Sequence, residues 1–323
     1  MTLPVVLTCG DPSGVGPEIA VAARQALGDD VPFVWIGDPR HLPVGTRWVE
    51  VETPGAALEV DAASLPVLRH DFPVEALPGA PDPANAKGVV DVIARAVGLV
   101  QDRAAGAICT SPISKAELKR HAGFVHPGHT EYLAHLGGVE DVVMMLAAEE
   151  LRVVPVTIHI PLSEVPKALT RQRLEATIRI TAEALKRDFG IASPRIAVSG
   201  LNPHAGEAGT MGREELDLVA PVLDELRREG LHLTGPLPGD TMFHATARAG
   251  YDAAICMYHD QALIPIKTLA FDRGVNVTLG LPFVRTSPDH GTAFDIAGKG
   301  LANPTSTIEA LKLAKRMAEG RGA

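Results

Sequence analysis

The chain has 323 residues, 46% of them hydrophobic and 21% charged, so it has the composition of a globular protein and the length for two domains. Its formal net charge of −9 would repel nucleic-acid phosphates and anionic lipids, which excludes either as the principal partner. Its three cysteines form no CxxC pair, and neither a signal peptide nor an apolar run of ~18 residues is present. We therefore expect a cytoplasmic protein without a membrane span.

Short apolar or β-branched runs alternate with longer amphipathic segments, a pattern typical of βαβ units around a largely parallel sheet. The predicted strands are, in chain order, 5–8, 33–36, 107–110, 153–158, 196–199, 253–257 and 275–279. The predicted helices are 17–26, 84–102, 171–189, 213–228 and 305–318. Residues 38–82 are rich in proline and small residues, and we expect short irregular connections there.

Three predicted strands are followed by a histidine: His159, His204 and His259. The carboxyl ends of strands line the ligand crevice of open α/β sheets, so three imidazoles placed there can converge on one divalent ion. Their spacing matches no local metal motif, and chance placement among 12 histidines is the alternative. Asp240 and Asp260 are candidates for orienting such ligands or for proton transfer, although Asp240 can equally be a helix N-cap.

The segment 126–131 places His129 and Thr130 just before an apolar helical run that begins near Tyr132. A helix N-terminus with such donors attracts an anion, whereas the simpler alternative is an ordinary N-cap with Glu131 in the first turn. The turn 110–115 adds hydroxyl groups and a lysine, a weak signal by itself.

Two cations late in the chain, Lys267 and Arg285, follow apolar residues. In an acidic protein they can neutralise a phosphate or carboxylate of a small substrate; structural ion pairs are the alternative. The glycine-rich segment 10–18 does not match GxGxxG, and 298–300 lacks the rest of a P-loop. A standard Rossmann fingerprint and ATP hydrolysis are therefore excluded.

Six motifs in the same order resemble the 4-hydroxythreonine-4-phosphate dehydrogenase family across nearly the whole chain. They lie at residues 10–18, 128–131, 199–207, 239–241, 258–261 and 290–300. The resemblance implies an α/β, two-lobed fold with a central cleft, similar to the isocitrate and isopropylmalate dehydrogenases. It implies a first lobe of residues 1–138 and 275–323 with the cofactor loop, and a second lobe of residues 139–274 with metal ligands and dimer contacts.

The same resemblance implies a homodimer whose active site draws on both subunits. It implies that His159, His204 and His259 bind one divalent metal ion (Zn, Mg or Co), one histidine reaching across from the partner. NAD or NADP would be held by the loop 290–299, and the residues assigned to it are His290, Gly291, Thr292, Asp295 and Ile296. The implied substrate contacts are His129, Thr130, Lys267, Asn276 and Arg285.

The implied reaction is oxidation and decarboxylation of 4-phosphooxy-L-threonine to 3-amino-2-oxopropyl phosphate in pyridoxal 5'-phosphate biosynthesis. Lys267 is the first candidate for the proton donor, with Asp240 and Asp260 as alternatives. Related dehydrogenases act on 4-phospho-D-threonate, 4-phospho-D-erythronate or cyclic dihydrodiols. A metal-dependent phosphatase or a phosphate-binding module is the non-redox alternative.

Overall fold

The computed structural model describes residues 3–322, which divide into two compact units. The first unit contains the chain up to Glu140 and again from Leu281 onward, and the second runs from Asp141 to Gly280. The division after residue 280, rather than after the expected 274, follows from strand pairing: residues 275–279 pair with 143–147 of the second unit. The predicted α/β class is confirmed.

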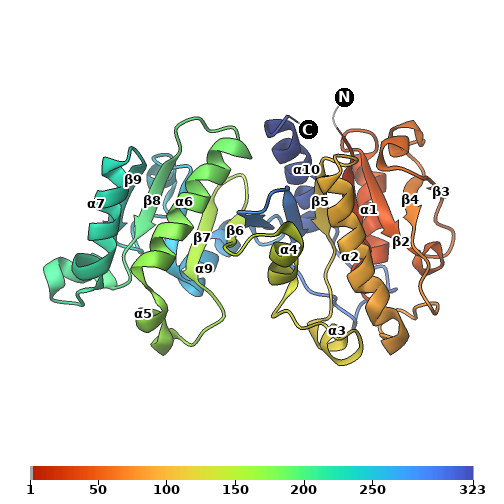
Figure 1. The fold of residues 1–323 in the computed structure, drawn as a ribbon, viewed down its shortest axis with the longest axis horizontal. Helices are drawn as coiled ribbons and strands as arrows, with labels where there is room; N and C mark the ends of the chain where they lie inside the picture. The colour runs from red at the N-terminus through yellow and green to blue at the C-terminus, as the bar shows by residue number, and fades with distance from the viewer. Residues whose placement is uncertain (1–2, 323) are drawn as a thin grey trace. The chain divides into compact units, whose positions relative to one another are not determined.

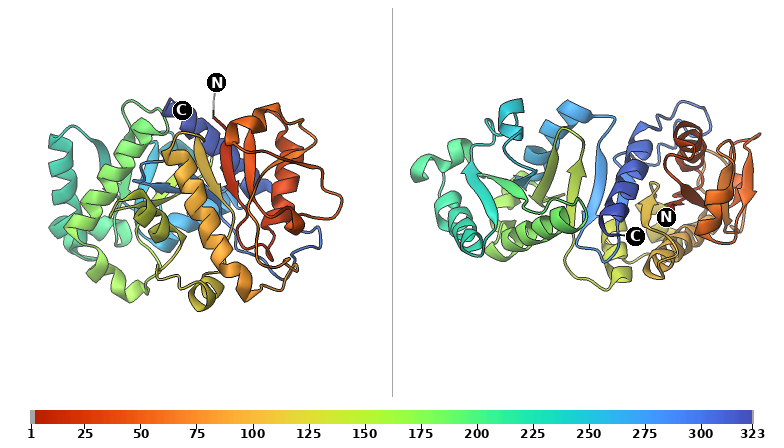
Figure 2. Two further views of the ribbon diagram at one scale, coloured as in Figure 1. Left: turned by 45° about the vertical axis from the view of Figure 1, so that its right-hand side comes forward. Right: turned by 90° about the horizontal axis from the view of Figure 1, so that it is seen from above.

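The first unit is built on a parallel sheet. Its described elements are, in chain order, β1 (Val5–Thr8), α1 (Gly16–Leu27), β2 (Phe33–Gly37), η1 (Pro39–His41), β3 (Trp48–Glu50), η2 (Pro54–Glu59), β4 (Leu65–Arg69), η3 (Pro83–Asn85), α2 (Ala86–Gln101), β5 (Ala107–Thr110), α3 (Lys115–His121), α4 (His129–Gly137), β12 (Arg285–Pro288) and α10 (Thr305–Gly320). The strand order is β3-β4-β2-β1-β5-β12 (Figure 1). Helices α1 and α10 pack together on one face, and α2 covers β1 and β5 from the other (Figure 2).

The expectation of irregular connections over residues 38–82 was wrong. This segment contributes β3 and β4, which extend the parallel sheet beyond β2. Leu65, Val67 and Leu68 of β4 are fully buried, so the strand forms because the sheet covers its apolar side chains. Pro66 lies within the strand, and its presence obscures the strand pattern in the sequence.

The second unit has a mixed sheet. Its described elements are, in chain order, β6 (Val143–Ala147), β7 (Arg152–Thr157), η4 (Leu162–Glu164), α5 (Val165–Ala168), α6 (Arg171–Arg187), β8 (Arg195–Ser199), η5 (Pro203–Gly209), the π-helical turn η6 (Glu215–Val219), α7 (Ala220–Arg228), β9 (His232–Leu237), α8 (Ala245–Arg248), β10 (Ala253–Tyr258), α9 (His259–Ala270) and β11 (Val275–Leu279). The strand order is β11-β6-β7-β10-β8-β9. β6 pairs antiparallel with both of its neighbours, whereas β7, β10, β8 and β9 are parallel. The largely parallel sheet that the sequence predicts is therefore interrupted in this unit by the antiparallel strand β6.

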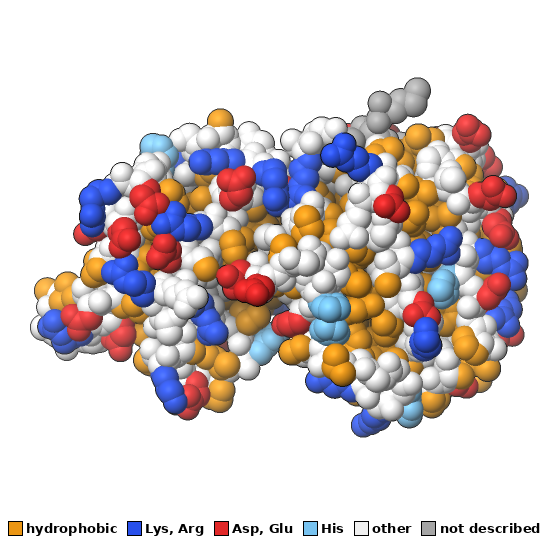
Figure 3. All heavy atoms as spheres, in the orientation of Figure 1, with side chains coloured by type: hydrophobic (Ala, Val, Ile, Leu, Met, Phe, Trp, Pro, Cys, Tyr) orange, Lys and Arg blue, Asp and Glu red, His pale blue; other side chains and the backbone are white. Residues whose placement is uncertain are grey.

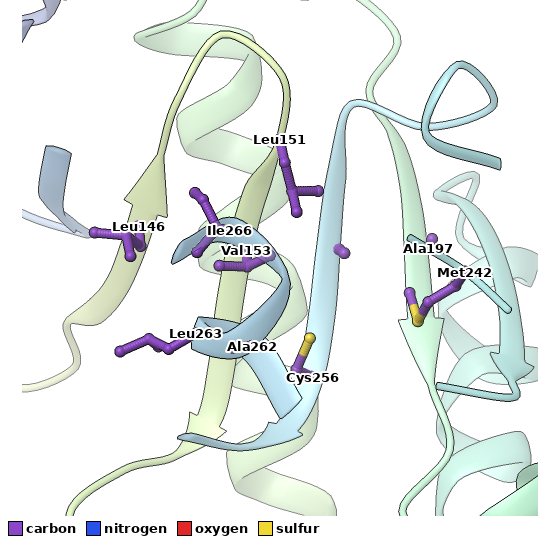
Figure 4. Close-up of a cluster of buried hydrophobic side chains, with 10 residues drawn as sticks. Leu146, Leu151, Val153, Ala197, Met242, Cys256, Ala262, Leu263 and Ile266 are labelled. Atoms are coloured by element: carbon purple, nitrogen blue, oxygen red, sulfur yellow. The ribbon is translucent and has the colours of Figure 1, made fainter. Parts of the chain in front are cut away.

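Helix α9 packs on one face of this sheet and closes an apolar core (Figure 4). Ala262, Leu263 and Ile266 of the helix contact strand residues that include Val153 and Cys256. The helix was not predicted from the sequence, because Pro265 lies inside it and proline disfavours a helix interior by about 3 kcal/mol. Burial of the apolar face offsets that penalty.

The opposite face of the second unit is covered by α6 and α7, whose outer surfaces carry interspersed charges of both signs (Figure 3). Arg179 pairs with Glu175 and with Glu229, at 2.8 and 2.6 Å. The predicted helix 213–228 begins as the π-helical turn η6, and its regular α-helical part starts only at Ala220. No helix in residues 3–322 combines the length and apolarity needed to cross a bilayer.

Arg24 of α1 is a buried arginine that ties the helix to the loop before β4. Its guanidinium donates hydrogen bonds to the carbonyl oxygens of Ser64, Gly28, Val60 and Asp61, at 2.7 to 3.1 Å. Only 4% of the side chain is exposed. Removing a donor from buried acceptors leaves each of them unsatisfied, which is costly.

We expect Arg24→Leu to lower the free energy of unfolding by about 3 kcal/mol, because four carbonyl oxygens lose their donor. The measurement is urea-induced unfolding followed by circular dichroism. Lys87→Ala, which removes an exposed pair with Asp91, is the control and should change stability by less than about 0.5 kcal/mol. Equal losses in the two variants would contradict the assigned role of Arg24.

Candidate functional site

Two of the three predicted metal ligands lie side by side in the second unit. β10 pairs in parallel with β7, so the two strands end at the same edge of the sheet. His159 follows β7 in a left-handed conformation (φ 54°), and His259 is the first residue of α9, directly after β10. The centres of the two imidazole rings are 5.8 Å apart. Zinc–imidazole bonds of about 2 Å allow rings at this separation to share one ion.

Asp260 orients one of these rings. Its Oδ1 lies 2.7 Å from His259 Nδ1, so the hydrogen bond leaves Nε2 of the ring for a ligand. A cavity of about 320 Å³ opens beside both histidines and is lined by residues 157–160, 162, 165 and 258–260. The donor set fits a divalent cation, with room for small molecules beside it.

His204 does not join the other two histidines within the chain. It lies in η5 after β8, is exposed, and has φ 52°. Across residues 3–322 there is no group of three His, Cys, Asp or Glu side chains that could hold one ion. Within the described residues of a single chain, two of the three predicted ligands, His159 and His259, therefore lie together.

The other predicted residues of the second unit are scattered over its elements. Asp240 is exposed in a turn, and the helix that follows starts at Ala245 with His244 as its cap, so the N-cap alternative for Asp240 was wrong. Lys267 is in α9, with its ammonium 5.5 Å from the centre of the Phe271 ring. Asn276 is in β11, and its buried Oδ1 has no hydrogen-bond partner among the described residues.

A cationic cluster forms in the first unit at the start of α4. Gly128 occupies the N-cap position without a side-chain cap, and His129 and Thr130 are the first helical residues. Arg285, at the start of β12, is 4% exposed. It donates from Nε and Nη2 to the Thr110 hydroxyl, at 3.1 and 2.7 Å. Donors from the start of α4 and from β12 thus lie near the backbone N–H groups of the first helical turn, an arrangement that suits an anion.

The electrostatics of this cluster support an anionic ligand. Burial lowers the pKa of Arg285 to about 10. Burial, together with the positive charges of Arg285 and Lys115, holds the pKa of His129 well below its usual range, so this imidazole is neutral at pH 7. His129 Nε2 is buried and has no hydrogen-bond partner among residues 3–322. Lys115 was only a weak candidate in the sequence, because its proximity to His129 is not visible there.

The predicted cofactor loop packs against the glycine-rich segment at the start of α1. Val15 N–H donates to Thr292 O at 3.0 Å, and Gly298 N–H donates to Glu18 Oε2 at 3.0 Å. A side chain at Gly14 would lie 2.8 Å from Thr292 O, so the close approach requires glycine there. The glycine-rich segment 10–18, which does not match the Rossmann pattern, therefore allows the loop 290–299 to pack closely against it.

Two of the groups assigned to the cofactor are accessible within that loop. Asp295 is exposed, and the space around Gly291 is open. His290 has a buried Nε2 without a partner among the described residues. Ile296 packs instead toward the apolar cluster of Val15, Ile19 and Ala297. A carboxylate, open backbone and an imidazole suit a ribose and a dinucleotide, whereas Ile296 contributes mainly to packing.

None of the three cysteines is a nucleophile candidate. All three are buried free thiols, and burial raises the pKa of each, for Cys109 to about 12. They therefore stay protonated at neutral pH and serve as core residues.

Known proteins similar to this chain identify its enzyme class. The chain is 65% identical to 4-hydroxythreonine-4-phosphate dehydrogenase of Paracoccus denitrificans, over 98% of both chains. The crystal structure of the Klebsiella pneumoniae enzyme of that name matches with a TM-score of 0.91 at 38% identity, covering 98% of each chain. A terephthalate 1,2-cis-dihydrodiol dehydrogenase from Burkholderia xenovorans is 29% identical, with a TM-score of 0.68 and 98% coverage of both. The chain is an oxidoreductase with an α/β fold.

The family follows from a sequence profile described as pyridoxal phosphate biosynthetic protein PdxA, which matches residues 30–314. The chain belongs to this family.

Asp11, which follows β1, is a buried carboxyl group outside the predicted set. It is 6% exposed, and its Oδ1 accepts a hydrogen bond from Ser13 N–H at 3.1 Å. Burial, with a smaller contribution from Glu117, raises the pKa of Asp11 to about 6. Since the pKa in the folded chain exceeds that in the unfolded chain, the stability from this group is full below pH ~4 and is lost as the pH rises through 6.

We expect Asp11→Asn, which mimics the protonated form, to gain on the order of 2–3 kcal/mol over the wild type as the pH rises from 4 to 7. Urea unfolding at several pH values measures the difference. Asp30→Asn, at an exposed position, is the control for the loss of a carboxylate charge. A difference between Asp11→Asn and the wild type that stays constant with pH would show that the Asp11 pKa is not raised by folding.

Proposed function

We propose that the protein oxidises 4-phosphooxy-L-threonine with NAD or NADP and decarboxylates the product to 3-amino-2-oxopropyl phosphate, a step in pyridoxal phosphate biosynthesis. Membership of the family and the names of its relatives support this substrate. The structural observation that carries the proposal is the cationic cluster at α4, where His129, Thr130 and Arg285 offer donors for a phosphate.

We propose that a Zn, Mg or Co ion is held by His159 and His259 of one subunit and His204 of a partner subunit. The ring separation of 5.8 Å and the bond from Asp260 support the first two ligands. The exposed His204, apart from them, supports a homodimer with shared sites. When bound, the ion would acidify the substrate hydroxyl and polarise the ketone that forms.

Different residues of this chain bind the phosphate and the cofactor. His129, Thr130 and Arg285 bind the phosphate and use that remote binding energy to orient the reacting carbon. The loop from His290 onward would hold the nicotinamide cofactor, with Asp295 toward a ribose hydroxyl, and the cofactor would supply the acceptor for the hydride of C3. The hydroxyl proton is released in this oxidation.

The resulting 2-amino-3-oxo acid loses CO2 and leaves an enolate that must regain one proton. Lys267 is our first candidate for donating that proton, with Asp240 or Asp260 as alternatives, and Asn276 as a substrate contact. Asn276 Oδ1 has no hydrogen-bond partner among the described residues, so it can accept a hydrogen bond from a substrate amine. In balance, substrate and oxidised cofactor give aminoketone phosphate, CO2 and reduced cofactor.

The substrate distinguishes this proposal from its redox alternatives. 4-Phospho-D-threonate and 4-phospho-D-erythronate also carry a phosphate, whereas the cis-dihydrodiol of the Burkholderia relative's name does not. The buried guanidinium of Arg285 and the buried His129 Nε2, which has no hydrogen-bond partner among the described residues, favour a phosphorylated substrate to which both can donate. A phosphatase or a phosphate-binding module conflicts with membership of a dehydrogenase family. We also place the reaction in the cytoplasm.

We expect NAD or NADP reduction, read at 340 nm, with 4-phosphooxy-L-threonine and much less with the two phospho sugar acids, with unphosphorylated 4-hydroxythreonine or with a cis-dihydrodiol. Chelator-treated protein should lose this activity and regain it with Zn, Co or Mg. Preference for another substrate would replace the proposed one, and activity indifferent to the chelator would exclude the metal.

We expect Arg285→Met to raise KM for the phosphorylated substrate by about 10–100-fold, since charge-assisted hydrogen bonds contribute about 1.5–3 kcal/mol. The binding of NAD, measured by calorimetry, should change little. The control for loss of a guanidinium is Arg321→Met. Arg321 is not part of the cationic cluster at α4 and donates hydrogen bonds to the carbonyl oxygens of residues 281 and 282. An unchanged KM for Arg285→Met would assign the arginine a structural role.

A further inference from the structure

The loop that carries His204 has an unusual backbone. Five successive residues, 204–208, have positive φ values of 52°, 52°, 78°, 42° and 55°, and only the third is glycine. The left-handed conformation costs roughly 1–2 kcal/mol for each non-glycine residue, so contacts elsewhere must hold the loop in place.

Glu215 provides those contacts from the π-helical turn η6. Its Oε1 accepts hydrogen bonds from the backbone N–H groups of Leu201 and Asn202, both at 2.7 Å. Its Oε2 accepts from Asn202 Nδ2 at 3.0 Å. Glu215 is 2% exposed, and a buried carboxylate with three donors is strongly attached to them.

The glycines of the loop allow this approach. A Cβ at Gly200 would lie 2.9 Å from Glu215 Oε1, and one at Gly206 would lie 2.6 Å from Oε2. Gly206 is the buried centre of the left-handed run, so the carboxylate lies against both the start of the loop and the middle of this run. Asn202 also donates to Glu214 at 2.7 Å, which lowers the pKa of Glu214.

The start of the loop is tied to helix α9, which begins at His259. Gln261 Nε2 donates to Gly200 O at 2.8 Å, and Gln261 Oε1 accepts from Met257 N–H at 2.7 Å. The loop thus begins in a fixed position beside β10, and the left-handed run leaves His204 exposed instead of beside His259.

We infer that Glu215 is a positioning residue: by holding loop 200–209 through Leu201, Asn202 and Gly206, it presents His204 outward as a metal ligand for a second copy of this chain. The inference rests on the shared metal site of the proposed function. Glu215 itself touches neither metal nor substrate and acts through the loop.

The first test measures Co(II) binding to the purified full-length dimer by equilibrium dialysis and by the visible absorption of the bound ion. Glu215→Gln keeps the size of the side chain but sets its amide against Asn202 Nδ2, and should weaken cobalt binding about 10–100-fold. Asp217→Asn, on the same turn but exposed and paired with Arg213, is the matched control and should bind cobalt as the wild type does. Unchanged affinity for Glu215→Gln overturns the inference.

The second test uses mixed dimers, co-expressed with two different tags and purified by both. In a dimer of one His159→Ala and one His204→Ala chain, one of the two shared sites keeps all its ligands, so one cobalt ion should bind. Glu215→Ala should behave as a His204 variant: paired with His159→Ala it regains one cobalt ion, and paired with His204→Ala it regains none. A general loss of stability would not distinguish the two partners.

The outcomes distinguish a failure of the shared metal site from a failure of the role assigned to Glu215. If the His159→Ala with His204→Ala dimer binds no cobalt, the shared site itself is refuted. If that dimer binds cobalt but Glu215→Ala regains it equally with either partner, only the role of Glu215 is refuted. Should Glu215→Ala fail to fold, as judged by circular dichroism, Glu215→Gln replaces it in the same mixtures with the same expected pattern.

Discussion

The parallel pairing of β10 with both β7 and β8 fixes where the polar side chains of the second unit can lie. Parallel strands deliver the residues that follow them to one edge of the sheet. His159 and His259 follow adjacent strands and therefore meet, with ring centres 5.8 Å apart. His204 follows β8 at the same edge, but four residues of loop separate it from the strand end, and the loop conformation decides its direction.

Buried charges in this protein are surrounded by hydrogen-bond partners. Arg24 has four carbonyl oxygens, Arg285 has the Thr110 hydroxyl, and Glu215 has two backbone N–H groups and an amide. Each group links segments that are apart in the sequence, and a buried charge is tolerated only when such partners stay in place. Asp11 has fewer donors, and its pKa is correspondingly raised.

The periodicity of the sequence predicted those strands and helices whose apolar residues recur at regular strand or helix spacing. Strands 5–8, 107–110 and 275–279 are confirmed as predicted, and helices α6 and α10 begin where predicted. The predictions failed where proline interrupts a pattern, as in β4 and α9, whereas the helix predicted over 213–228 is present but begins as a π-helical turn. In these places burial and hydrogen bonds from distant segments override local preference.

By itself the sequence determined the α/β class, the order of most elements and the identity of the residues that end up at strand ends, because these depend on local periodicity and residue type. Only the tertiary structure decided that His159 and His259 come together while His204 does not, and that Lys115 lies near His129. Such proximities depend on which strands become neighbours and on how buried groups such as Glu215 are satisfied. Those are long-range interactions that no local pattern contains.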